Sequence, residues 1–88
     1  MIPYIAEYLG TFLFLGVIRA TSGNPIWSGV ALAVGIYLTS ALSGGNLNPA
    51  VSVMNLALGA MSLNQTLLYI ISQVMAGLTV AAVIPKVL

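Results

Sequence analysis

The chain of 88 residues has no cysteine and no histidine, and its charged side chains are two basic and one acidic. Without cysteine there is no disulfide and no thiol nucleophile, and without either residue type the usual ligands of soft metals are missing. Two basic residues cannot form the electropositive surface that binds nucleic acid. No acid–base pair and no nucleophile beside a base is present, so we expect no enzyme, metal, cofactor or nucleic-acid partner.

Apolar residues dominate the composition, because 60% of the chain is hydrophobic and 3% is charged. A soluble domain needs far more polar surface than this. The sequence therefore predicts an integral, multi-pass protein of the lipid bilayer. The N-terminus lacks a basic region followed by a small-residue cleavage site, so we expect the first apolar segment to be retained as a helix.

Three apolar stretches are long enough to cross the hydrocarbon core, which takes roughly 17 to 25 residues of helix. They cover residues 3–20, 26–42 and 64–83. The polar break at residues 21–25 contains Asn24-Pro25, which should start the second helix and make the first two helices antiparallel neighbours. Ser62 or Asn64 is expected to cap the third long helix.

A further apolar segment, residues 49–59, is too short to span the membrane and predicts a re-entrant half-helix. Non-helical backbone is tolerated at membrane depth only inside protein or beside water, so the residues before the half-helix should face a polar path. The predicted fold is all-α and membrane-embedded. It has three transmembrane helices and one re-entrant half-helix in a single domain, residues 1–88.

Asn48 and Pro49 are suited to start this half-helix. The Asn48 side-chain oxygen can cap the helix, Pro49 has no N–H to leave unpaired, and the Asn48 amide remains free to donate. The helix N-terminus also carries roughly half an elementary positive charge, which attracts a solute oxygen and opposes cations, including protons. The alternative is that Asn-Pro-Ala is an ordinary helix start.

Four motifs follow one another along the chain. They are Ala6-Glu7-Tyr8-Leu9-Gly10-Thr11-Phe12, Ala31-Leu32-Ala33-Val34-Gly35-Ile36, Ser43-Gly44-Gly45-Asn46-Leu47-Asn48-Pro49-Ala50-Val51 and Tyr69-Ile70-Ile71-Ser72-Gln73-Val74-Met75-Ala76-Gly77. In this order and spacing they resemble the N-terminal half of the aquaporin and glycerol-facilitator (major intrinsic protein) family, over nearly the whole chain. The resemblance implies half of an aquaporin-like fold and a passive channel for water or small neutral solutes such as glycerol.

The resemblance also implies roles for individual residues. The residues that would line the pore are Gly44, Gly45, Asn46, Asn48, Pro49 and Ala50. The residues that match the constriction, none of them charged, are Ser28, Ile36, Gly45 and Val51. Glu7 and Gln73 would brace the loop. The alternatives are that Glu7 is solvated near the membrane surface and that Gln73 forms a simple interhelical hydrogen bond.

The chain departs from the family pattern. Gly45 and Asn46 stand where the familiar loop has Ala and His, so the side-chain hydrogen bonds of the loop must differ. The inverted second half, with its selectivity Arg, is absent from these residues. One half cannot enclose a pore, so we expect a partner. The partner would be a second, inverted copy in an antiparallel homodimer or higher homo-oligomer, or another membrane subunit.

The charges at the helix ends leave the orientation weakly defined, because Arg19 and Lys86 should lie on one membrane face. Two other functions are also compatible with the sequence. One is a non-conducting structural subunit of a larger viral or organellar assembly. The other is a holin-like pore former or dual-topology small transporter, in which Glu7 would be the proton-coupled site.

Overall fold

The computed structural model describes all of residues 1–88, and every regular element in it is an α-helix. The helices are α1 (Ile2–Ala20), α2 (Pro25–Ser43), α3 (Pro49–Ala57) and α4 (Leu63–Val83). Their ends differ from the predicted segments by no more than two residues. The prediction of an all-α fold with three long helices and one short helix is confirmed.

Local sequence explains where the later helices begin. The Asn24 side-chain oxygen accepts from two backbone N–H groups in the first turn of α2, at 3.0 Å each. The Ser62 hydroxyl accepts from the Gln65 N–H at 3.1 Å, so Ser62 is the residue that caps α4. A proline starts both α2 and α3, at the position where a missing N–H leaves nothing unpaired.

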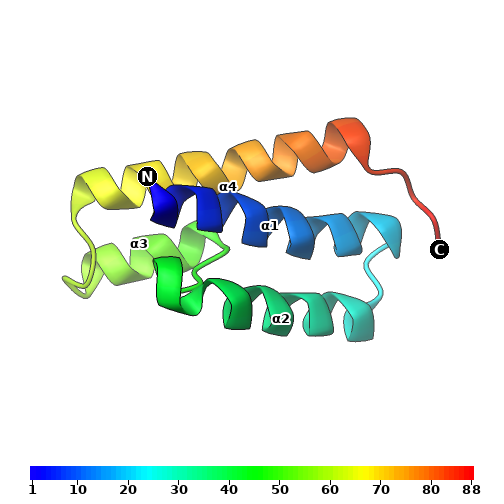
Figure 1. Ribbon diagram of the computed structural model, residues 1–88, viewed down its shortest axis with the longest axis horizontal. Helices are drawn as coiled ribbons and strands as arrows, with labels where there is room; N and C mark the ends of the chain where they lie inside the picture. The colour runs from blue at the N-terminus through cyan, green and yellow to red at the C-terminus, as the bar shows by residue number, and fades with distance from the viewer.

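α1 lies in the middle of the molecule and packs against α2 on one side and α4 on the other (Figure 1). α2 and α4 do not pack against each other, whereas α3 packs against α4. α3 begins part of the way along the molecule and runs back toward the end at which α2 finishes (Figure 1). The chain therefore enters from one end and returns to the same end, which is the re-entrant path that the short apolar segment predicts.

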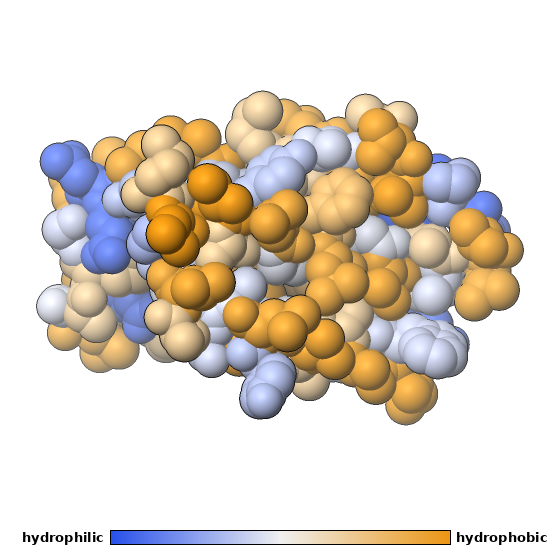
Figure 2. All heavy atoms as spheres, in the orientation of Figure 1, coloured by the Kyte–Doolittle hydropathy of each residue, from blue (hydrophilic) through white to orange (hydrophobic).

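The three long helices are suited to the bilayer, since α1, α2 and α4 have 19, 19 and 21 residues and are apolar along their length. Figure 2 shows an apolar surface around the middle of the molecule and polar residues gathered toward the two ends of its long axis. Exposed leucine, isoleucine and valine side chains on all three helices form this surface. The protein is an integral, multi-pass membrane protein.

The turn after α1 and the tail after α4 meet at one end of the molecule. Arg19 Nε donates to the Ile84 carbonyl at 3.3 Å, and two N–H groups of the tail donate to the Ala20 carbonyl at 2.9 and 2.8 Å. These bonds satisfy acceptors that the last turns of two helices would leave free. They also place the cations Arg19 and Lys86 near the same end.

Candidate functional site: the loop before the half-helix

Residues 44–48 connect α2 to α3 in an irregular conformation. Three of them have positive φ: Gly44 at 86°, Gly45 at 62° and Leu47 at 54°. Glycine adopts positive φ without steric cost, and Gly44 ends α2 as a left-handed cap. Leu47 has a side chain, so its left-handed backbone costs roughly 1–2 kcal/mol and other contacts must hold it.

The carboxyl group of Glu7 lies against this loop and is fully buried, at 0% exposure. One oxygen accepts from the Leu47 N–H at 2.8 Å and from Gln73 Nε2 at 2.9 Å. The other accepts from the Asn46 N–H at 3.0 Å and from the Ser43 hydroxyl at 2.6 Å. Four donors around one carboxyl group offset the cost of burying it in a membrane protein. The alternative of a Glu7 solvated near the membrane surface is wrong.

A second set of hydrogen bonds joins the loop to α3 and α4. Asn46 Nδ2 donates to Ser52 Oγ at 2.9 Å and contacts Met61 Sδ at 3.3 Å, while Asn46 Oδ1 accepts from Asn55 at 3.3 Å. Gln73 Nε2 donates to the same Ser52 hydroxyl at 3.0 Å. Gln73 therefore reaches the loop through Glu7 and Ser52, and it forms no hydrogen bond to the loop backbone itself.

Ser43, at the end of α2, is also tied to its neighbours. Its carbonyl accepts from the Tyr69 hydroxyl at 2.7 Å, and its own hydroxyl accepts from the Gly45 N–H at 3.3 Å. The Tyr69 bond links α4 to the end of α2, two helices that do not pack together elsewhere. The loop is thus contacted from α1, α2, α3 and α4.

The N–H groups of loop residues 44–47 form hydrogen bonds within the chain, whereas the carbonyls of these residues form none. The N–H groups of Gly44, Gly45, Asn46 and Leu47 all donate within the protein, to Ser40, Ser43 and Glu7. The carbonyls of the same four residues accept no hydrogen bond from the chain. Backbone carbonyls in protein interiors and membranes are normally paired. The four carbonyls are therefore acceptors without a partner in the chain, on one exposed residue, Gly44, and on three buried residues, Gly45, Asn46 and Leu47.

Asn48 adds donors to this row of acceptors. Its Oδ1 caps α3 by accepting from the Ala50 N–H at 2.8 Å, with an extended backbone of φ −158° and ψ 128°. Neither its side-chain amide nor its backbone N–H donates within the chain. Asn48, Pro49 and Ala50 are all exposed. The segment therefore presents free carbonyls first and free N–H groups last, at the positive end of α3.

The four residues expected at the constriction are only partly brought together. Gly45 packs against α2, where a Cβ added to it would lie 3.2 Å from both the Cγ2 and the carbonyl oxygen of Ile36. Ser28 precedes Ile36 on α2 by two helical turns, about 12 Å along the axis, and Val51 is half-buried in the first turn of α3. Within one chain, Gly45 therefore packs against Ile36, whereas Ser28 lies two helical turns away from Ile36 along α2.

Sequence reasoning assigned no side-chain role to four residues that contact or form the loop: Ser43, Leu47, Ser52 and Tyr69. Ser52 carried a usable signal, because a small polar residue in an apolar membrane helix is expected to face a protein interior. Tyr69 and Ser43 carried no such signal in the sequence, because the hydrogen bond between them depends on where α4 passes the end of α2. Leu47 looked like any apolar residue, and only its backbone conformation and its burial at 2% exposure distinguish it.

These features define a class of protein. It comprises membrane-embedded helical units in which a half-helix, started by Asn-Pro-Ala, follows a loop of free carbonyls that is tied to the surrounding helices. The chain belongs to the major intrinsic protein family, because its residues 2–88 match that family.

Individual relatives agree with this membership. The chain is 33% identical to aquaporin-10 of Milnesium tardigradum, over 91% of the chain and 23% of that protein. It is 33% identical to a probable aquaporin PIP-type 7a of Pisum sativum, over 91% of the chain and 33% of the relative. It is 36% identical to the propanediol uptake facilitator PduF of Salmonella typhimurium, over 77% of the chain and 31% of that protein.

The chain therefore spans about a quarter to a third of the length of these curated relatives. No solved structure significantly matches the chain.

Proposed function

We propose that this chain forms half of the wall of a passive membrane channel for water and small uncharged solutes. The observation that supports the proposal is the row of four unpaired carbonyls at residues 44–47, followed by the free amide of Asn48. A row of acceptors that ends in donors can replace the hydrogen bonds that a neutral solute loses on leaving water. An apolar membrane subunit without a transport role would have no use for five unpaired polar groups.

The charges along the proposed path favour neutral solutes. The N-terminus of α3 carries a partial positive charge at Asn48, which opposes cations and protons. The expected constriction residues Ser28, Ile36, Gly45 and Val51 are uncharged. One relative is named a propanediol uptake facilitator, which is consistent with a small polyol as solute. We assign the path to water and small polyols such as glycerol.

Glu7 and Gln73 brace this path in our proposal. Glu7 takes up the N–H groups of Asn46 and Leu47, and this turns the carbonyls of the loop away from internal partners. Gln73 orients Glu7 and Ser52 rather than the loop itself. The same proposal assigns pore-lining roles to Gly44, Gly45, Asn46, Asn48, Pro49 and Ala50, and the unpaired carbonyls of residues 44–47 and the free amide of Asn48 support it.

A second, inverted copy completes the wall in this proposal. The exposed residues 48–50 and the free carbonyls need a protein cover in the bilayer, because each unpaired backbone group facing lipid costs several kcal/mol. An inverted copy supplies a matching half-helix from the opposite side, as paired halves do in inverted-repeat transporters. The two cations at one end of the chain impose little orientation preference against such a pair.

Permeability of vesicles containing the purified chain tests the proposal. We expect water and glycerol permeability above that of empty vesicles, with no proton leak. Asn48→Asp keeps an oxygen to cap α3 but replaces the free amide donor with a negative charge, so we expect protons and cations to leak. The same exchange at Asn64, which is exposed and makes no side-chain hydrogen bond, is the matched control and should leave permeability unchanged. Water and glycerol permeability equal to that of empty vesicles would contradict the proposed channel function.

A further inference from the structure

Leu47 occupies a notch between α1 and α2. A Cβ added to Gly10 would lie 2.6 Å from Leu47 Cδ2, and one added to Gly35 would lie 2.9 Å from Leu47 Cδ1. Carbon atoms that are not bonded do not approach this closely, since their optimum separation is about 3.5–4.0 Å. The two glycines therefore leave the space that the Leu47 side chain fills, and Leu47 is buried there at 2% exposure.

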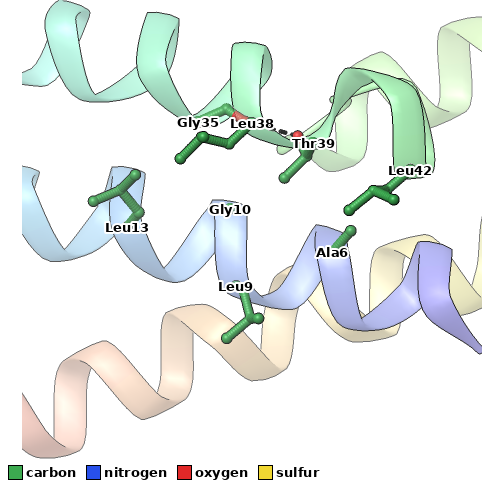
Figure 3. A pocket seen from close by; sticks show the side chains of 8 residues that line it. All are labelled: Ala6, Leu9, Gly10, Leu13, Gly35, Leu38, Thr39 and Leu42. Atoms are coloured by element: carbon green, nitrogen blue, oxygen red, sulfur yellow. Dashed lines mark hydrogen bonds between the residues drawn. The ribbon is translucent and has the colours of Figure 1, made fainter.

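The helices around this notch are shown in Figure 3, where Gly10 of α1 lies opposite Gly35 and Thr39 of α2. The Thr39 hydroxyl donates to the Gly35 carbonyl at 2.7 Å, and Thr39 Cγ2 lies 3.0 Å from a Cβ added to Gly10. The same residues line an apolar groove of about 230 Å³ between the two helices. The α1–α2 contact is thus close at the glycines but not filled around them.

Leu47 is the loop residue whose side chain attaches to α1 and α2. Gly44 and Gly45 have no side chain, Asn46 reaches α3, and Asn48 caps α3. Leu47 is also held through its backbone, because its N–H donates to Glu7 at 2.8 Å. Two attachments on one residue hold a left-handed backbone, φ 54°, that an unconstrained leucine rarely adopts.

We propose that Leu47 is a positioning residue for the path. Seated between Gly10 and Gly35, its side chain fixes the loop in the conformation that leaves the four carbonyls and the Asn48 amide free. Leu47 contacts helices rather than solute, and it acts through the backbone on either side of it. The inference rests on the proposed channel for its effect on solutes, but its effect on the loop is independent of conduction.

The Leu47→Ala and Gly35→Ala variants, alone and together, test the proposal. Gly35→Ala places a methyl group 2.9 Å from Leu47 Cδ1, so the Leu47 side chain must shift from its position in the notch. We expect the N–H groups of Asn46 and Leu47 to exchange with deuterium roughly tenfold faster in each single variant, because loosened segments open more often. Water permeability per folded chain should fall in both.

The double variant distinguishes positioning from general damage. With the leucine methyls gone, the methyl group of Gly35→Ala meets no obstacle, so the double variant should resemble Leu47→Ala alone. Gly29→Ala is the matched control on the same helix, because a Cβ there meets nothing within 4 Å, and it should change neither readout. Leu47→Met refills the notch with a flexible side chain of similar volume and should restore slow exchange and permeability.

Three results would overturn the proposal. They are Gly35→Ala behaving like Gly29→Ala, the two single effects multiplying in the double variant, and Leu47→Met exchanging as fast as Leu47→Ala. If Gly35→Ala fails to fold, the comparison of Leu47→Met with Leu47→Ala still decides. Deuterium exchange reports on the notch even in vesicles that conduct nothing, so a failed channel and a failed notch give different results.

Discussion

At the scale of single residues, Glu7 is the least expected feature of an apolar chain. It is the one acidic residue, it is fully buried, and it has no basic partner. Its compensation comes entirely from four hydrogen-bond donors, two of them backbone N–H groups of the loop. Each donor has a fixed position on the carboxyl group. The four hydrogen bonds that offset the cost of burying the acid therefore also hold the loop in one conformation.

Glu7→Gln should lower stability strongly. A carboxamide has one acceptor oxygen instead of two, so at least one backbone donor of the loop loses its partner. Each buried donor left unpaired costs about 1–3 kcal/mol. Thermal unfolding in detergent micelles or nanodiscs measures the effect. Asn64→Asp, an acid–amide exchange at an exposed position, should change stability by less than about 0.5 kcal/mol. Equal melting temperatures for both variants would contradict this role of Glu7.

Residue-level features could be predicted from the sequence only where one residue type has few possible uses. Glu7 in an apolar helix was expected to face the interior, with solvation near the membrane surface as the alternative, and Asn48 before Pro49 was expected to cap a helix; the structure buries the first and uses the second as the cap of α3. Leu47 could not be predicted, because leucine is common everywhere in this chain. Its position depends on two glycines that are 25 residues apart in sequence.

At the scale of elements, the short helix α3 decides the architecture. Its nine residues reach only part of the way through a bilayer, about 13 Å at 1.5 Å per residue. α3 packs on α4, and its start is tied to α1 through Asn46, Ser52 and Gln73.

The sequence predicted the helix ends well because Asn24, Ser62 and the prolines are local signals. It did not predict that α1 would separate α2 from α4, since this depends on packing between distant segments.

Tyr69→Phe should loosen the connection between α4 and the end of α2. The Tyr69 hydroxyl donates to the Ser43 carbonyl at 2.7 Å, and the variant leaves that carbonyl without its partner. A neutral hydrogen bond of this kind contributes about 0.5–1.5 kcal/mol. Tyr37→Phe is the control, because Tyr37 is 82% exposed and makes no side-chain hydrogen bond. We expect a lower melting temperature for Tyr69→Phe alone, and a matching loss in both variants would refute the assignment.

At the scale of the whole molecule, a buried polar network lies inside an apolar shell. The exposed surface around the middle is made of side chains suited to lipid, whereas Glu7, Asn46, Ser52, Thr66 and Gln73 are buried. α2 and α4 are held apart by α1, and Gly44, Asn48, Pro49 and Ala50 remain exposed at the loop and at the start of α3. In our proposal a second protein surface completes the path, and an inverted copy of the chain supplies it.

Cross-linking of single-cysteine chains tests this pairing most directly, because the protein has no cysteine of its own. In an inverted pair the starts of the two α3 helices meet near the membrane centre, whereas their ends lie toward opposite surfaces. Ala50→Cys and Ala57→Cys place one thiol at each end of α3. A short thiol-reactive cross-linker in vesicles should give covalent dimers with Ala50→Cys and none with Ala57→Cys. Dimers formed equally through both positions, or through neither, would contradict a path built from two inverted copies.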